Sequence, residues 1–436
     1  MVVLEQLQAR RIIEILGQSG TPPSNGVSHY NVGNDSLINA LDAHYLSSYL
    51  PDGGATFKLV VGGYGSGKSH FLYCVRDLAW RRGFAVSKVD LSPKECPYND
   101  QKRVYAAVAA AVTWRDPDTD ESDDPGLVRL IEGTLRRLLA ADGLDPRDPD
   151  AEQNPNIEGL LESLESGVAI DSPSYRKAIV AYCRALIRGD DGREESLMRW
   201  LHGEEVTNND MRDLKVIGVT EKINKNNAFR MLRSLCQVVR ALQYNGLALL
   251  FDEGDRMTSI GGKPEKEATD NLREIIDRCR EDLPGALFVY AVPPVFINEV
   301  IPKYPALQQR VDAPGYFSRS NPFSPQINLE KQLDLQGVAF LTEVGRRLMP
   351  IFRTAYPESS LSNDVQVDNI LILAQAADEL VLDVSSRRLF VKTLVTLWHD
   401  QMINGEVQIS PDQAVGLIRG GHDALNALHD SQQRPY

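Results

Sequence analysis

The amino-acid sequence predicts an α/β protein in which buried, parallel strands alternate with helices. Three segments carry this prediction: an apolar run followed by glycines and a helix at 57–82, an apolar run closed by two acids at 246–253, and a further apolar run at 286–292. Each run is short and is bounded by turn residues, as expected of strands buried on both faces. Helical periodicity fills much of the chain between the runs, so we expect the strands to be joined by helices in βα units.

Apolar spacing and helix-end signals give the expected order of elements along the chain. The first part is expected to contain helices at 8–17, 35–48, 68–82 and 101–114 and strands at 57–62 and 84–91. The middle part has helical spacing at 125–141, 156–166, 173–188 and 193–202. The last part is expected to contain helices at 226–243, 268–280, 304–311 and 385–404 and strands at 246–253, 286–292 and 326–329.

The positions of the strands predict the domain organisation. Residues 1–114 and 226–330 are expected to form the two parts of one α/β core. Residues 115–225 lie between them and are expected to be a helical insertion, broken by acidic loops that contain proline. Residues 331–436 carry helical signals and are expected to form a small all-helical domain. A chain of 436 residues is long enough for two or three domains.

Composition and charge argue against several classes of protein. With 42% hydrophobic and 25% charged residues, the chain has the composition of a globular protein rather than of a disordered or fibrous one. It carries 47 basic and 60 acidic residues, and the resulting net charge of −13 works against strong non-specific binding of nucleic acid. Five scattered cysteines form no CxxC or Cys/His cluster, so neither a zinc site nor a disulfide framework is indicated.

The sequence gives no sign of membrane insertion or export. The apolar stretch at 286–296 is shorter than the roughly 18 residues that a membrane span needs, and it contains Pro293 and Pro294. Residues 1–17 look like an amphipathic helix with charges throughout and lack the continuous apolar centre of a signal peptide. We therefore expect a cytoplasmic protein that makes no membrane contact.

A glycine-rich loop between a strand and a helix is the first candidate functional site in the sequence. Gly62, Gly67, Lys68 and Ser69 meet the pattern G-x-x-x-x-G-K-[ST], the P-loop or Walker A motif. In this motif the N–H groups, the helix N-terminus and the lysine converge on a polyphosphate, and the serine hydroxyl contacts Mg²⁺. The alternative is a glycine turn that happens to precede a lysine. The residues expected to contact the polyphosphate are Gly63, Tyr64, Gly65, Ser66, Gly67, Lys68 and Ser69, with His70 beside them.

An acidic pair is the second feature that a phosphate-binding loop of this kind requires. The apolar run at 246–253 ends in Asp252 and Glu253. Asp252 is expected to orient Mg²⁺ through water, and Glu253 is expected to act as the general base that polarises the attacking water. Taken alone, the pair also fits a solvated turn after a strand. The two features together predict that ATP and Mg²⁺ are the cofactors.

These two motifs resemble those of the AAA+ ATPases, in which an acidic pair follows the second nucleotide-binding strand and a helical lid follows the α/β core. The stretches ARRIIEILGQSGTPPSNGVSHYNVGND, VVGGYGSGKSHFL and LLFDEGDRM are similar, more narrowly, to the ATP-binding proteins of bacterial BREX phage-defence systems, of the BrxD kind. Those proteins are themselves similar to origin-recognition initiators. The narrow resemblance covers mainly residues 9–96 and 245–311. It implies an AAA+ P-loop core with a helical insertion and a C-terminal helical lid.

The resemblance also implies roles for residues outside the two motifs. A segment before the first strand contacts adenine in the AAA+ family, and Val32 and Gly33 occupy the matching position. A simple turn before a capped helix fits these two residues equally well. The family expects a polar residue that senses the γ-phosphate after the strand at 286–292, but Pro293 and Pro294 follow here. The sensor is therefore missing or displaced, and this departure from the family's pattern implies slow hydrolysis.

Two arginine positions follow from the resemblance. An arginine finger reaches a neighbouring subunit's nucleotide in the family, and Arg310 in YPALQQRVD has the matching place, although an ordinary surface arginine would look the same. The family's lid holds an arginine that contacts the phosphates of its own chain. Arg387 is the first candidate and Arg388 the second, because both lie in the first turn of a helix, where positive charge is unfavourable to the helix dipole.

The leading functional hypothesis is an ATP-hydrolysing switch. Nucleotide is expected to bind between core and lid, and the lid movement is expected to be recognised by other proteins of a defence complex, with a helicase among the candidates. A homo-oligomer formed through Arg310 is a further expected partner. One alternative is a DNA loader or remodeller like the initiators. Arg230, Arg233 and Arg240, on one face of a predicted helix, fit a contact with DNA, a contact with an acidic neighbour, or a solvated face. The other alternative is a scaffold that holds nucleotide with little turnover.

Overall fold

The structure is a computed structural model that describes residues 4–115, 124–254, 262–281, 283–380 and 386–433. The chain folds into two compact units. Unit 1 contains Met1–Asn39, Val61–Val75 and Asn328–Tyr436, and unit 2 contains Ala40–Val60 and Arg76–Ile327. Residues 116–123, which are part of the acidic loop predicted at 115–126, lie outside the described residues. In the described part of the chain, no helix has the length and the apolar character that a membrane crossing requires.

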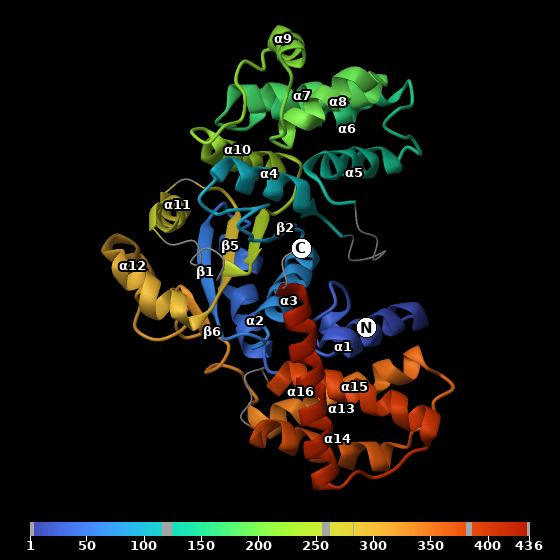
Figure 1. The fold of residues 1–436 in the computed structure, drawn as a ribbon. Coiled ribbons are helices and arrows are strands. Elements are labelled where there is room, and N and C mark those ends of the chain that lie inside the picture. The colour runs from blue at the N-terminus through green and yellow to red at the C-terminus, as the bar shows by residue number, and fades with distance from the viewer. Residues whose placement is uncertain (1–3, 116–123, 255–261, 282, 381–385, 434–436) are drawn as a thin grey trace. The chain divides into compact units, whose positions relative to one another are not determined.

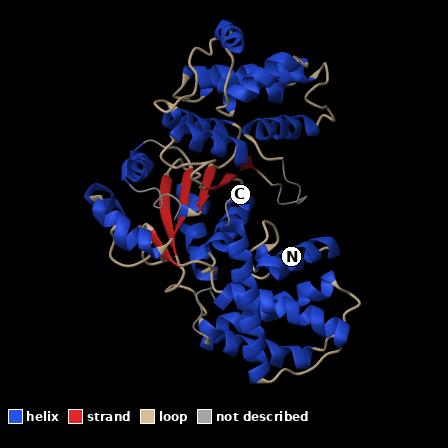
Figure 2. Ribbon diagram, in the orientation of Figure 1, coloured by secondary structure: helices blue, strands red, loops and turns tan. Residues whose placement is uncertain are grey.

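The described strands form one six-stranded, mostly parallel sheet (Figure 2). Its order is β3-β2-β4-β5-β1-β6. The strands are β1 (Ala55–Val61), β2 (Ala85–Asp90), β3 (Val112–Thr113), β4 (Leu247–Asp252), β5 (Ala286–Val292) and β6 (Gln326–Asn328). The predictions for β1, β2, β4, β5 and β6 are confirmed to within two residues at each end, and β5 has the predicted bounds. The prediction for Val112–Thr113 was wrong, because these residues end a predicted helix but pair antiparallel with β2.

Parallel pairing in the centre of the sheet brings aromatic side chains into register. β4 pairs with β2 on one side and with β5 on the other, and both pairs are parallel. Phe251 lies opposite Tyr290, and their rings stack with centroids 4.6 Å apart. The Tyr290 hydroxyl lies 2.5 Å from that of Tyr98, so this buried polar atom has a hydrogen-bond partner. Every residue of β4 and β5 is buried, which explains why their sequence is continuously apolar apart from Asp252.

Helices surround the sheet in unit 2 and also form a group of their own (Figure 1). α4 contacts β2, α10 contacts β4, and these two helices contact each other. The group α5–α9 falls within the predicted insertion, and α7 has its predicted bounds. The helices are α4 (Gln101–Ala111), α5 (Leu127–Ala140), α6 (Pro155–Glu162), α7 (Pro173–Arg188), α8 (Asp191–Leu201), α9 (Asn208–Val216), α10 (Ala228–Ala241), α11 (Gly262–Glu281) and α12 (Pro305–Val311).

Unit 1 has a helical core of its own. The first helix, α1, packs against two helices from the C-terminal part of the chain, α13 and α15 (Figure 1). Among the C-terminal helices, α14 contacts α13, α15 and α16. Trp398, Phe352 and Leu16 are among the buried residues of this core. The helices are α1 (Gln6–Ser19), α13 (Gly337–Ala355), α14 (Asn363–Glu379), α15 (Ser386–Asn404) and α16 (Pro411–Gln433). The predicted start of α15 at Ser385 lies outside the described residues.

Two helices contain residues of both units. α2 (Asp35–Leu41) continues as a π-helical segment, Asp42–Tyr49, and α3 (Lys68–Arg81) follows the glycine loop. The prediction of one helix at 35–48 is therefore confirmed in extent, although its second half is more widely wound than an α-helix.

A buried lysine connects β1 to the loop before β6 in unit 2. Only 1% of Lys58 is exposed. Its Nζ donates to the Tyr45 hydroxyl at 3.1 Å and to the carbonyl oxygens of Pro322 at 2.8 Å and Ser324 at 2.9 Å. The rings of Tyr45 and Phe317 lie 4.6 and 4.7 Å from the same atom. Burial lowers the pKa of Lys58 to about 7.

Lys58 is expected to make the stability of the protein depend on pH. The unfolded chain holds this proton up to a pKa near 10.5 and the folded chain only up to about 7, so the unfolded state binds more protons between these values. The free energy of unfolding of the wild type, relative to Lys58→Met, should therefore rise above pH 7 by at most about 1.4 kcal/mol per pH unit. Urea unfolding of both proteins from pH 6.5 to 9 measures this difference. A difference that stays constant across the range contradicts the prediction.

Candidate functional site

The glycine loop follows a buried strand and opens a helix, as its motif requires. β1 ends at Val61 and α3 begins at Lys68. Gly65 and Gly67 have φ values of 70° and 96°, a conformation that residues with a side chain rarely adopt. At Gly62, an added Cβ would collide with the hydroxyl of Ser66. The glycines of this loop are therefore needed for its conformation.

Lys68 is directed back over the start of the loop. Its Nζ donates to the carbonyl oxygens of Gly62 and Gly63, both at 2.8 Å. Ser66 is buried, and among the described residues its hydroxyl oxygen has no hydrogen-bond partner. Unpartnered buried polar atoms are uncommon in folded proteins and point to a missing ligand or water. An ammonium group, a helix N-terminus and an unpaired hydroxyl together fit a polyphosphate.

Three side chains from the C-terminal part of unit 1 contact this loop. Glu330 accepts a hydrogen bond from the N–H of Gly63 at 2.6 Å. Arg387 donates to the carbonyl oxygen of Ser66. Arg388 donates to the hydroxyl of Tyr64 and, at 2.6 Å, to the carbonyl oxygen of Ser19. The predicted residues Arg387 and Arg388 thus both lie at the loop, whereas Glu330 was not predicted.

Arg387 is held over an aromatic ring. Its guanidinium carbon lies 4.7 Å from the centroid of the Phe340 ring. Burial lowers the pKa of Arg387, and the nearby carboxylate of Glu330 acts in the opposite direction. The group stays charged at neutral pH because the ordinary pKa of arginine is above 12. The α15 terminus therefore presents a positive charge to the glycine loop.

The segment predicted to contact adenine packs against the same helical elements. Val32 is buried, and Gly33 has a φ of 74°. The carbonyl oxygen of Gly33 accepts from the N–H of Asp334 at 3.0 Å, and a Cβ at Gly33 would lie 3.4 Å from the Phe340 ring. The Phe340 ring therefore lies near Gly33 and against Arg387, two residues predicted for the same site.

Asn31 links this segment to the helix after the loop. Its Oδ1 lies 3.1 Å from Nε2 of His70, and it accepts from the side chains of Asn34 at 3.0 Å and Cys74 at 3.4 Å. Burial lowers the pKa of His70 to about 4, so this imidazole is neutral at pH 7. The carbonyl oxygen of Asn31 also accepts from Arg347. Sequence reasoning missed Asn31 because no motif marks it, and three of these four partners come from distant positions.

The acidic pair lies at the end of β4 in unit 2. Asp252 is 4% exposed, and its Oδ1 accepts from the N–H of Glu253 at 2.9 Å. Its Oδ2 lies 3.5 Å from Nζ of Lys88, which also contacts Asp90 at 2.5 Å. Glu253 has a φ of 57°, an uncommon conformation for a residue other than glycine. Such strain is found preferentially at functional sites.

The predicted metal site stays a prediction. Ser69 is the second residue of α3, and Asp252 is the last residue of β4. Within the described ranges, no group of three or more His, Cys, Asp or Glu side chains has the arrangement of a metal site. A Mg²⁺ ion bound with ATP takes several ligands from phosphates and water, so one hydroxyl and one carboxylate suffice chemically.

Arg310, the predicted arginine finger, is ion-paired within its own chain. It lies in the last turn of α12 and donates through Nε and Nη2 to the carboxylate of Asp277, the second bond being 2.8 Å long. Its Nη1 donates to the carbonyl oxygen of Ala306 at 2.6 Å. This pairing lowers the pKa of Asp277. A role in a neighbouring subunit would require Arg310 to leave Asp277.

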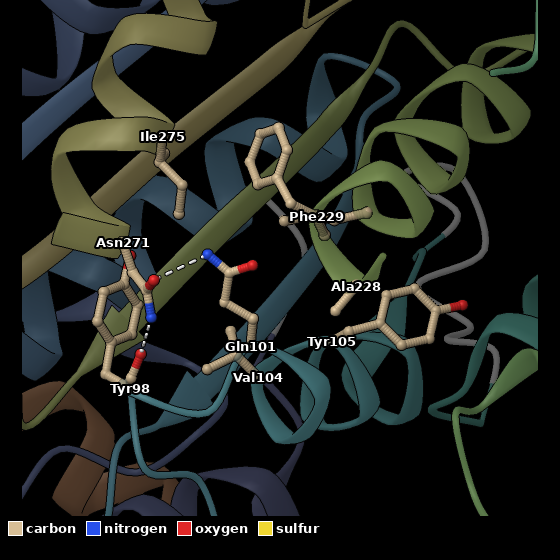
Figure 3. Close-up of a pocket in the computed structure, with 9 residues that line it drawn as sticks. Tyr98, Gln101, Val104, Tyr105, Ala228, Phe229, Asn271 and Ile275 are labelled. Carbon is tan, nitrogen blue, oxygen red and sulfur yellow. Dashed lines mark hydrogen bonds between the residues drawn. The ribbon is translucent and has the colours of Figure 1, made fainter. Parts of the chain in front are cut away.

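A small apolar pocket lies elsewhere in unit 2, among α4, α10 and α11 (Figure 3). Leu232, Phe229 and Ile275 line it, and Gln101 Nε2 donates to Asn271 Oδ1 at 2.9 Å at its edge. Its volume of about 20 Å³ is enough for a water molecule but not for a nucleotide. This pocket therefore does not compete with the glycine loop as a nucleotide site.

Fold and loop together define the class of protein: a mixed α/β protein with a mostly parallel sheet, consistent with a P-loop nucleoside-triphosphatase fold. The sequence model of the family described as BREX system ATP-binding protein BrxC/D matches residues 4–415, and the chain therefore belongs to this family. Comparison with curated proteins gives no match, and neither does comparison with solved structures.

Proposed function

We propose that the chain binds ATP at residues 62–69 and acts as a nucleotide-controlled switch in a BREX-type phage-defence complex. The observation that carries this proposal is the phosphate loop itself: Lys68 lies over it, the hydroxyl of Ser66 is buried in it, and Arg387 contacts it. Membership of the BrxC/D family supports ATP as the ligand and other BREX proteins as partners. The finer proposals are an AAA+ architecture, a BrxD-like role and a relation to initiator ATPases.

Each residue of the proposed site has a chemical role. Lys68 and the loop amides bind the β and γ phosphates, and Ser69 and Asp252 hold Mg²⁺. Bound Mg²⁺ neutralises charge that develops on the phosphate oxygens. Glu253 accepts a proton from the attacking water, and Arg387 stabilises negative charge on the phosphates. Val32 and Gly33 are proposed to contact the adenine ring.

The switch is proposed to act through Arg387. In the structure this arginine donates to the backbone of Ser66, so the helix that carries it is connected directly to the phosphate loop. A phosphate oxygen is a stronger partner for a guanidinium than a peptide carbonyl is. ATP should therefore draw Arg387 away from Ser66 and shift the N-terminus of α15. Such a shift in a helical segment is a movement that a partner protein can recognise.

The arginines that suggested a DNA contact are engaged within the chain. Arg230 pairs with Glu221 and Arg233 pairs with Asp171. Arg240 donates to the carbonyl oxygens of Leu50 at 3.0 Å and Pro51 at 2.9 Å. With a net charge of −13 as well, these contacts favour protein partners over DNA.

A nucleotide-holding scaffold is the second candidate function, because Pro293 and Pro294 follow β5 where a polar residue is expected in an active ATPase. Glu253→Gln separates the two functions. In a hydrolysing switch this variant should lose about 100-fold or more in ATP turnover while it keeps its affinity for ATP, because only the general base is removed.

Phosphate release measures ATP turnover, and a nucleotide titration of the same preparations measures ATP affinity. Glu281→Gln, a change of the same kind at the exposed end of α11, is the matched control and should keep the wild-type rate. A wild-type protein that binds ATP without any turnover to lose would establish the scaffold instead.

A further inference from the structure

A carboxylate lies at the phosphate loop, where an anion is expected to bind. Oε1 of Glu330 is 2.6 Å from the amide nitrogen of Gly63, and a Cβ at Gly63 would lie 3.0 Å from the same oxygen. Loop amides in this motif favour negative charge, and the carboxylate of Glu330 satisfies one of them. This contact belongs to neither of the two motifs that define the site.

The position of Glu330 is fixed by the backbone around it. The N–H of Leu329 donates to the carbonyl oxygen of Val61, the last residue of β1, at 3.0 Å. The N–H of Glu330 donates to Oδ1 of Asn328 at 3.0 Å, and Asn328 in turn accepts from Lys331 and donates to Gln332. A turn hydrogen-bonded to the end of β1 thus places Glu330 beside the first residues of the loop.

Glu330 and Lys68 bind the two polar backbone groups of the same residue, Gly63. Nζ of Lys68 is 2.8 Å from the carbonyl oxygen of Gly63, while Glu330 binds its N–H. The lysine of this motif reaches the β and γ phosphates. We therefore expect the terminal phosphate of a bound nucleotide to come near Gly63 and to meet the negative charge of Glu330 there.

We propose that Glu330 sets the affinity of the site and its preference between nucleotides, by competing with the terminal phosphate for the loop. This inference rests on the proposed function. ATP carries more charge at that end than ADP, so Glu330 disfavours ATP more than ADP. Bound ATP displaces Glu330 from Gly63 and ends its attraction to Arg387, which is then available to the phosphates. Glu330 thereby links occupation of the loop to the turn that precedes α13.

The test is Glu330→Gln, which keeps the size and the acceptor oxygen of the side chain and removes its charge. In the presence of Mg²⁺, ATP should bind about three- to tenfold more tightly to this variant than to the wild type, and ADP should change less. Titrations of both nucleotides against the full chain give the ratio of the two dissociation constants. A merely structural role for Glu330 would not move this ratio.

Glu358→Gln removes one exposed negative charge from unit 1 and serves as the control for net charge. It should leave both dissociation constants as they are in the wild type. If Glu330→Gln leaves the ratio unchanged or weakens ATP binding, the inference is overturned while the proposed function stands. If the wild type binds neither nucleotide, the proposed function falls, and this inference falls with it.

Discussion

Lys68→Ala is expected to weaken ATP binding by roughly 10- to 150-fold, corresponding to the loss of about 1.5–3 kcal/mol from one charge-assisted contact. The reason is geometric. The ammonium group lies within 2.8 Å of two loop carbonyl oxygens, and it is therefore already held over the start of the loop. The ammonium group could therefore contact bound phosphates without a large rearrangement of the loop. Isothermal titration of wild type and variant with ATP and Mg²⁺ measures the loss.

Lys215→Ala is the matched control, because Lys215 is exposed on α9 in the other unit. It should bind ATP as the wild type does. Thermal unfolding of both variants separates loss of binding from loss of folding, since Lys68 also donates to Gly62 and Gly63. Undiminished affinity in a folded Lys68→Ala variant would refute the assignment of the phosphate site.

Arg387→Ala should produce the second-largest effect on ATP affinity, a loss of roughly 5- to 30-fold. Arg387 contacts the buried Ser66 and stacks on Phe340, whereas Arg388 contacts Tyr64, of which 66% is exposed. Charge next to the buried part of the loop is screened less by water than charge at its rim. Arg388→Ala should therefore cost clearly less than Arg387→Ala.

Arg387→Lys tests whether the planar guanidinium matters as well as its charge. Lysine cannot both stack on Phe340 and hold a forked pair of hydrogen bonds, so it should recover only part of the lost affinity. The same nucleotide titration compares the three variants. Equal losses for Arg387→Ala and Arg388→Ala would show that the two positions do not differ and would remove the basis for assigning the lid role to Arg387.

Much of the fold could be predicted because its strands are buried on both faces. β4 and β5 are continuous apolar runs bounded by turn residues, and such runs are visible in a single sequence. β3 could not be predicted, because an alanine-rich helix leads directly into Val112 and Thr113, and only pairing with β2 makes them a strand. α9 was missed although its capping box, Thr207 with Asp210, is a readable signal before a helix.

The candidate site also contains some features that the sequence predicts and others that it does not. The glycine loop and the acidic pair are local patterns in which each residue's role follows from its neighbours, so sequence alone predicts them. Glu330 and Asn31 contact the loop region across 267 and 39 positions of the chain. Contacts of this kind depend on how the chain folds back, and a single sequence does not show them. The pairing of Arg310 with Asp277 is of the same type, because it spans two helices.

Amide hydrogen exchange with and without saturating ATP and Mg²⁺ reports where on the chain the nucleotide binds. We expect slower exchange for the amides of residues 62–70 when ATP is present, and we expect Lys68→Ala to abolish this protection at the same ATP concentration. Unchanged exchange at 62–70, combined with protection around the apolar pocket lined by Phe229 and Ile275, would refute the proposed nucleotide site.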